Sequence, residues 1–199
     1  MKNKIAYQGR PGAYSHLVCI KAFPNYEPVP CESFEEVFKK TENKETEISL
    51  IPIENSQAGR VADIHNLLPM SNLVITGEYF HKVSHHLLGC PGSSLSSIKT
   101  AESHLHALAQ CKDFLSKNKI KPIISADTAG AAEEIAKAKN NSRAAIASEL
   151  AAKIYNLTIL SSNIEDATHN TTRFLFMKED FEEVRMKDAD YITSFIFQV

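Results

Sequence analysis

Residues 170–174, Asn-Thr-Thr-Arg-Phe, combine side chains that could act together on an anionic substrate. The Thr172 hydroxyl can donate to a leaving oxygen, and Arg173 offers a carboxylate a planar set of donors that stays charged. The Phe174 ring can shield a site from water. The set is predicted to lie where a loop leads into the apolar strand 174–177. It suits the loss of an oxygen leaving group, although a strand-edge threonine beside a surface arginine would give the same tripeptide.

Composition narrows the class of protein. The 199 residues are 43% hydrophobic and 23% charged, which is ordinary for a soluble globular protein. The formal net charge of -2 gives no support for a nucleic-acid or membrane-surface partner. No apolar run is long enough to span a bilayer, and the N-terminus lacks the apolar core of a signal peptide. We therefore expect a cytoplasmic protein that acts on a small molecule.

Cysteines and histidines give no sign of a metal centre. The four cysteines are scattered without a Cys-x-x-Cys pair, so we expect free thiols. His85 and His86 are adjacent in a strand-like run, and their side chains should therefore point to opposite faces. His104 and His106 are two residues apart near a helix start, which is poor geometry for one ion. The sequence predicts neither a metal nor a cofactor.

Strand-like and helix-like segments alternate along the chain, which predicts an α/β fold, with two lobes of about eighty residues each. Short apolar runs predict the strands, and longer runs with apolar residues on one face predict the helices. The expected strands are 4–7, 48–53, 73–78, 83–88, 121–126, 144–147, 157–160 and 174–177. The expected helices start near 14, 34, 61, 105, 129 and 149.

Small polar residues gather at four strand-to-helix junctions. A helix N-terminus presents unpaired N–H groups and a partial positive charge, so it attracts anions. Each junction alone could be a helix cap worth about 1 kcal/mol of stability, but four junctions with one chemistry favour a shared anion-binding role. The junction residues are Gly9, Gly12 and Ser15; Asn55, Ser56 and Gly59; Ser103 and His104; and Asp127, Thr128, Ala129 and Gly130.

Four ordered segments resemble prephenate dehydratase over nearly the whole chain. They are residues 5–15, 51–61 with a Pro-x-Glu-Asn-Ser-x-x-Gly pattern, 103–111, and 163–174 with Thr-Arg-Phe. The third segment departs from the family pattern, because Leu105 stands where proline is usual and His106 where glutamine is usual. That departure puts any substrate role of these two positions in doubt, but not the resemblance.

The resemblance implies a two-lobed fold like that of type II periplasmic binding proteins, with a cleft between the lobes. Residues 1–78 plus 162–185 would form the first lobe, and residues 79–161 the second. The implied reaction is the conversion of prephenate to phenylpyruvate, water and carbon dioxide in phenylalanine biosynthesis, without a cofactor or metal. Family members assemble as homodimers or homotetramers.

The resemblance also assigns roles to residues. The essential threonine of the family falls on Thr172, and its neighbour Thr171 does not align with it. We expect Thr172 to donate to the departing ring hydroxyl, Arg173 to pair with a carboxylate or to brace the hinge, and Phe174 to border the site. The residues expected to orient the carboxylates and the pyruvyl group are Asn55, Ser56, Thr128 and Asn170.

The last ten residues, 190–199, resemble the first strand of the ACT regulatory domain, which binds phenylalanine in the family. The rest of that domain is absent from this sequence, so we expect no feedback by phenylalanine. Two alternatives stay open at this stage. One is arogenate dehydratase activity, and the other is a non-catalytic module that binds a small anion on the same scaffold.

Overall fold

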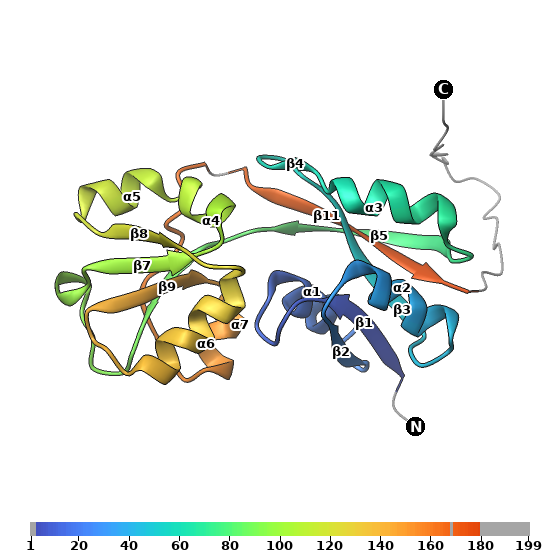
Figure 1. Cartoon of the computed structure of the whole chain (residues 1–199), viewed down its shortest axis with the longest axis horizontal. Coiled ribbons are helices and arrows are strands. Elements are labelled where there is room, and N and C mark those ends of the chain that lie inside the picture. Colours follow the sequence, from blue (N-terminus) through green and yellow to red (C-terminus); the bar gives the residue numbers. More distant parts are fainter. Residues whose placement is uncertain (1–2, 168, 180–199) are drawn as a thin grey trace.

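The computed structural model describes residues 3–167 and 169–179, which form two lobes (Figure 1). The first lobe contains a mixed sheet in the order β2-β1-β3-β11-β5, with the short β4 paired to β3. Its strands are β1 (Lys4–Gln8), β2 (Glu27–Cys31), β3 (Ile48–Asn55), β4 (Gly59–Arg60), β5 (Val74–Lys82) and β11 (Thr171–Lys178). Its helices are α1 (Tyr14–Ala22), α2 (Phe34–Glu42), α3 (Ala62–Leu67) and the 3-10 turn η1 (Leu68–Met70).

The second lobe contains a five-stranded sheet in the order β10-β6-β9-β7-β8. Its strands are β6 (His86–Gly89), β7 (Thr100–Ser103), β8 (Lys121–Ile124), β9 (Arg143–Ala147) and β10 (Thr158–Ser161). Its helices are α4 (Leu105–Ala109), α5 (Lys112–Lys117), α6 (Thr128–Ala138), α7 (Glu149–Ile154) and the 3-10 turn η2 (Leu95–Ser97).

The two sheets share one topology. In each, three strands run parallel (β2-β1-β3 and β8-β7-β9), and the next strand is antiparallel to them. That antiparallel strand, β11 or β6, is the one that enters from the other lobe. The chain therefore crosses between the lobes twice, at residues 83–85 and 162–170. This arrangement confirms the expected α/β class, two-lobed and type II periplasmic-binding-protein-like.

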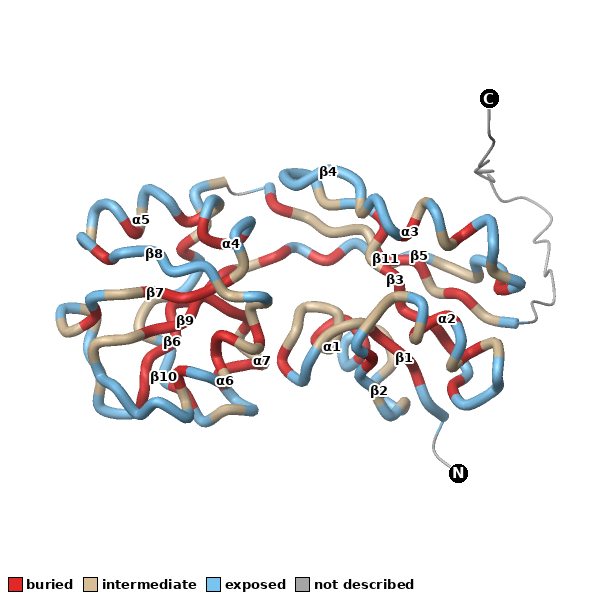
Figure 2. Tube along the Cα trace, viewed as in Figure 1, coloured by how far each residue is buried: buried red, intermediate tan, exposed pale blue. Residues whose placement is uncertain are grey.

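Each sheet is covered by helices on both faces. In the first lobe, Ile5 and Tyr7 of β1 pack in one core cluster with Val18 of α1, while Ala6 packs in the other with Val37 of α2. This follows from the alternation of side chains along a strand. In the second lobe, α4 and α5 cover one face, and α6 and α7 the other. Figure 2 shows buried residues concentrated on the central strands.

Several expected boundaries differ in the structure. Strand β2 was not predicted, because Pro28 and Pro30 remove two hydrogen-bond donors; an edge position, paired only with β1, tolerates this. The single helix expected to start at 105 is two helices, α4 and α5. Strand β5 continues in the first sheet to Lys82, past residue 78. Residues 180–185 and the proposed regulatory strand at 190–199 lie outside the described residues.

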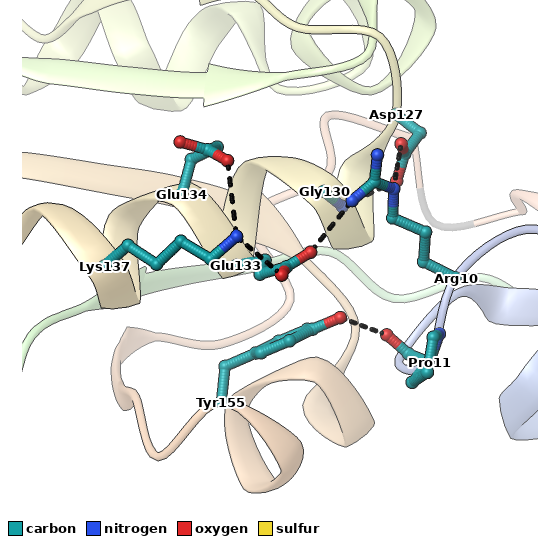
Figure 3. A network of polar contacts seen from close by, with 8 residues as sticks. All are labelled: Arg10, Pro11, Asp127, Gly130, Glu133, Glu134, Lys137 and Tyr155. Carbon is teal, nitrogen blue, oxygen red and sulfur yellow. Dashed lines mark hydrogen bonds and ion pairs between the residues drawn. The ribbon is translucent and has the colours of Figure 1, made fainter.

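The loop between β1 and α1 is the part of the first lobe that docks against the second (Figure 3). The Arg10 guanidinium bonds to Glu133 of α6, with 2.9 Å between Nη1 and Oε2. The Tyr155 hydroxyl donates to the carbonyl of Pro11 at 2.8 Å, and the Ser148 hydroxyl donates to the carbonyl of Gly12 at 2.6 Å. These contacts hold the loop against α6 and α7.

Replacement of Gly12 by alanine should disturb this docking. Gly12 has a φ of +92°, and an added Cβ would lie 2.9 Å from the Cα of Ala151 in α7. Left-handed backbone and overpacking together predict a loss of about 2–4 kcal/mol in the free energy of unfolding. Urea unfolding measures that loss, and small-angle scattering would show whether the lobes separate.

Gly92→Ala is the matched control for Gly12→Ala. Gly92 has a similar φ of +88°, but an added Cβ there would meet no atom within 4 Å. Its variant should therefore lose only the backbone contribution of about 1–2 kcal/mol. Equal losses in the two variants would show that the contact with α7 contributes nothing.

Candidate active site

A cleft of about 1370 Å³ lies between the lobes and is lined by residues from both of them. Each of the four junctions identified in the sequence contributes to its wall, as the carboxyl ends of parallel strands predict. The contributing junction residues are Gly9, Ser15, Asn55, His104, Asp127 and Thr128. The four junctions that the sequence predicts to bind an anion therefore meet at one place.

Two helix N-termini from different lobes border this cleft. Helix α1 contributes Tyr14 and Ser15, and its N-cap residue makes no side-chain cap. Helix α6 contributes Thr128, and its N-cap Asp127 accepts a hydrogen bond from the Gly130 N–H at 2.6 Å. The remaining first-turn N–H groups of both helices have no intrahelical partner. The cleft therefore has a partial positive charge on each side.

Arg10 is the residue of the cleft wall that carries a whole positive charge, in contrast to the partial charges of the helix N-termini. Among the described residues that line the cleft, it is the one lysine or arginine. Its guanidinium is paired with Glu133, and its Nε lies 3.7 Å from Asp127 (Figure 3). Hydrogen bonding to Glu133, followed by the charge of Asp127, raises the pKa of Arg10. Both carboxylates therefore offset the charge of Arg10, whose pairing with Glu133 joins the two lobes at this wall.

Thr172 lies inside β11, not in a loop before it as the sequence suggested. It is paired with Asn55 of β3 on one side and with His81 of β5 on the other. The Asn55 side-chain amide donates to the Thr172 oxygen at 2.9 Å. The hydroxyl hydrogen makes no bond to another of the described residues, so it is available for a ligand. Thr172 lines the cleft, so this donor faces the space where a substrate would bind.

The orientation of the Asn55 amide is fixed by the backbone. Its Oδ1 accepts from the N–H groups of Gln57 at 2.9 Å and Ala58 at 2.8 Å, so its Nδ2 must face the other way. Nδ2 donates to Thr172 and also to Oδ1 of Asn170 at 2.8 Å. Asn170 must then direct its own Nδ2 to Gln110 Oε1, at 2.9 Å. Two backbone donors thus set the direction of every bond that follows.

The same chain of hydrogen bonds continues across the second lobe to α1. Gln110 Oε1 is also 2.8 Å from His85 Nε2, which must therefore carry the hydrogen. Burial lowers the pKa of His85, which favours the neutral ring, so its Nδ1 is an acceptor. The Tyr14 hydroxyl hydrogen lies between this nitrogen, at 2.7 Å, and the carbonyl oxygen of Ser84, at 3.0 Å. Burial raises the pKa of Tyr14, which keeps this proton in place. The network links both lobes and both crossings.

Sequence reasoning gave no role to Gln110, His85 or Tyr14. All three line the cleft, and Gln110 still has its side-chain NH2 free of partners within the described chain. Gln110 belongs to the motif at 103–111 and Tyr14 to the motif at 5–15, so those motifs were the available signal. His85 had no comparable signal, because its partners are distant in sequence.

Arg173 does not line the cleft, because alternation along β11 places it on the face opposite to that of Thr172. Its guanidinium bonds to Glu78 of β5 at 2.7 Å and to Glu54 of β3 at 3.3 Å, and lies 5.8 Å from the Phe80 ring centroid. It thus connects the two strands that flank β11. This geometry does not support a carboxylate-binding role and agrees with the bracing alternative.

Phe174 and Ser56 do not line the cleft either. Phe174 is 2% exposed and packs in the core with Ile5 and Tyr7. The Ser56 hydroxyl donates to the carbonyl of His169 at 2.7 Å and accepts from the Thr171 N–H at 3.0 Å. Ser56 therefore fixes the chain just before β11. The predicted site residues that do line the cleft are Thr172, Asn55, Thr128 and Asn170.

In the part of the chain that the structure describes, no group of three or more histidine, cysteine, aspartate or glutamate side chains could hold a metal ion. His104 and His106 both line the cleft, with ring centroids 5.1 Å apart. Leu105 between them is 53% exposed.

Among the helices of residues 3–167 and 169–179, none is both long and apolar enough to cross a membrane.

Comparison with known proteins gives the class that this fold and cleft define. The sequence model of the prephenate dehydratase family matches residues 5–182. The chain therefore belongs to the prephenate dehydratase family, whose relatives here act as prephenate or arogenate dehydratases. This places it among lyases of aromatic amino acid biosynthesis.

Individual relatives agree with this family. A bifunctional N-acyl-homoserine lactone acylase/prephenate dehydratase of Komagataeibacter europaeus is 41% identical over 98% of this chain and 69% of that protein. Arogenate dehydratase/prephenate dehydratase 1 of Arabidopsis thaliana is 41% identical over 100% of this chain and 50% of that protein. The solved structure of the quorum-quenching acylase GqqA has a TM-score of 0.86 and 41% identity, over 92% of this chain and 67% of that chain. The chain spans about half the length of the plant relative.

Proposed function

We propose that this chain is a prephenate dehydratase, which converts prephenate to phenylpyruvate, water and carbon dioxide. The observation that carries the proposal is the Thr172 hydroxyl, which lines the cleft while its oxygen accepts from Asn55. The oxygen uses a lone pair in that bond, and the hydroxyl hydrogen can still be donated to a ligand. Prephenate has one group that needs such a donor, the ring hydroxyl that must leave.

The reaction breaks two bonds and aromatises the ring. The electron pair of the bond between the ring and its carboxylate moves into the ring as carbon dioxide leaves. The electron pair that enters the ring expels the hydroxyl oxygen, so the ring C–O bond breaks. A proton then converts the departing oxygen to water. Thr172 would stabilise that oxygen by hydrogen bonding as negative charge develops on it. Its hydroxyl is too weak an acid to be fully deprotonated, so solvent finally supplies the proton.

The two carboxylates of prephenate match the two helix N-termini that border the cleft. One carboxylate would lie at the first turn of α6, near Thr128, and the other near the first turn of α1. Asn55 and Asn170 hold fixed amide orientations next to Thr172, and Gln110 adds a free NH2 donor. Because these dipoles are oriented before the substrate arrives, they stabilise developing charge without rearranging.

Arogenate is the alternative substrate, and it carries an ammonium group where prephenate has a keto oxygen. The carboxylates of Glu32, Glu36 and Asp127 also line the cleft and could accept an ammonium group. Asp127 is already occupied by the Gly130 N–H and lies next to Arg10, and Glu36 accepts from the Glu32 N–H. These commitments weaken two of the three carboxylates, Asp127 and Glu36, as partners for an ammonium group, which favours prephenate. A cytoplasmic location and a homo-oligomeric state are also predictions of this proposal.

Separate assays with prephenate and arogenate test the substrate assignment. The purified chain receives each compound in turn, and phenylpyruvate or phenylalanine is quantified as product. We expect a kcat/KM at least about tenfold higher for prephenate, because one misplaced or unpaired polar group commonly has an effect of that size. A higher kcat/KM for arogenate would reverse the assignment. Binding of prephenate without turnover would identify the chain as a binding module.

A further inference from the structure

A second, smaller cavity of about 180 Å³ lies at the hinge. Tyr14 lines both this cavity and the cleft, so its side chain stands between them. His85 lines the cleft and His86 the smaller cavity, as the opposite directions of adjacent strand residues predict. The other lining residues are Leu17, Lys21, His81, Lys82, Ser84, Glu149 and Asn163. The hinge cavity is therefore distinct from the cleft and mostly polar.

Two buried imidazoles line the hinge cavity, and a ring nitrogen of one of them, His86, lacks a hydrogen-bond partner. His86 is 9% exposed, and its Nδ1 is a buried polar atom without a hydrogen-bond partner among the described residues. His81 is 6% exposed, and burial, followed by the charge of Lys21, lowers its pKa to about 4. Both rings are therefore neutral near pH 7, with one N–H donor each. Buried polar groups normally have partners, so the unpaired Nδ1 of His86 needs an explanation.

The charges around the hinge cavity favour an anion. Among the lining residues, Lys21 and Lys82 carry two positive charges and Glu149 carries one negative charge. The charge of Glu165, which does not line the cavity, also acts on His86. Lys21 lies 3.7 Å from Glu149, and both side chains are 43% exposed, so water weakens this pair. Lys82 has no ion pair in the described part of the chain. A ligand anion could therefore bind the ammonium group of Lys82. At Lys21 it could bind beside the Glu149 carboxylate or displace it.

We propose that the hinge cavity is a binding site for a small oxyanion, a phosphate or a short carboxylate. Lys21 and Lys82 would supply the charge, and the imidazole N–H groups and the Ser84 hydroxyl would supply oriented donors. An occupant would touch α1 in the first lobe, α7 in the second, and both crossings. It would therefore join the two lobes at their hinge. The site uses no residue assigned to prephenate turnover, so it stands or falls independently of that activity.

Residue-resolved NMR of the histidine rings tests the hinge cavity. The chain is labelled with 15N-histidine and titrated at pH 7 with inorganic phosphate, and separately with acetate, while sodium chloride holds the ionic strength constant. The spectra of His81→Gln and His86→Gln assign the two resonances. We expect His81 and His86 to shift saturably with at least one anion. The tighter of the two anions identifies the ligand as phosphate-like or carboxylate-like.

Two lysine variants decide whether these shifts report the proposed site. In Lys21→Ala/Lys82→Ala, affinity should fall by about tenfold or more, because both charge-assisted bonds are lost. Lys112→Ala/Lys117→Ala on α5 removes the same charge elsewhere and should leave affinity unchanged. The proposal is overturned if neither anion shifts His81 and His86, if only the cleft residues His104 and His106 respond, or if both double variants bind equally.

Discussion

Replacement of Thr172 by valine is expected to lower kcat for prephenate by about 10²- to 10⁴-fold, the range for loss of a positioned proton donor. Valine has nearly the shape of threonine and a high preference for strands, so β11 should keep its pairing with Asn55 and His81. The variant removes only the hydroxyl that faces the cleft. Initial rates of phenylpyruvate formation at saturating prephenate measure the change.

Thr172→Ser is the control for this prediction. Serine keeps a hydroxyl that can accept from Asn55 and donate to the substrate, so kcat should stay within about tenfold of the wild-type value. Circular dichroism and the thermal midpoint should be nearly unchanged in both variants. If the valine variant turns prephenate over as fast as the serine variant, the hydrogen-bond donor to the leaving oxygen must be sought elsewhere in the cleft.

Replacement of Asn55 by leucine is expected to damage both activity and stability. Leucine matches asparagine in size but leaves the N–H groups of Gln57 and Ala58 without their acceptor. It also removes the donor to Thr172 and Asn170. Asn170 is 1% exposed, and the loss of the donor to its Oδ1 predicts a loss of about 1–3 kcal/mol in the free energy of unfolding. We expect kcat to fall by about 10²-fold, since the Thr172 hydroxyl is no longer oriented.

Two further variants separate these effects. Asn55→Asp keeps an acceptor for the two backbone N–H groups but places a carboxylate oxygen against Thr172 and Asn170, so the bonds to Gln57 and Ala58 should survive while kcat still falls. Asn118→Leu, at the end of α5, removes a side-chain bond to the Phe114 carbonyl away from the cleft and should leave kcat unchanged. Urea unfolding and steady-state kinetics supply both readouts. Full activity in Asn55→Asp would contradict the orienting role.

Local patterns were sufficient to predict most elements and the place where they meet. Apolar periodicity located the central strands, and the polar residues after them marked the junctions that line the cleft. The shared topology of the lobes left no sequence repeat to detect. Strand β2 escaped prediction because its prolines are compatible only with an edge position, and the sheet order decides which strand is an edge.

The side-chain geometry of the site was harder to predict. Thr172 and Arg173 were expected to face one ligand, but strand pairing begins at Thr171 and therefore places them on opposite faces. Had the start of β11 been known, the two-residue period alone would have separated them. The network from Asn55 to Tyr14 joins residues that are distant in the chain, such as His85 and Gln110. Only the folded chain brings them together.

The most direct test of the account is the stoichiometry of products formed from prephenate by the purified chain near neutral pH. Phenylpyruvate can be followed by its absorbance in alkali, and carbon dioxide by a coupled assay. We predict equal amounts of the two products, formed well above the rate without protein and unchanged by a chelator. Failure of the folded chain to form phenylpyruvate above that background would contradict the assignment of the cleft as a prephenate dehydratase site.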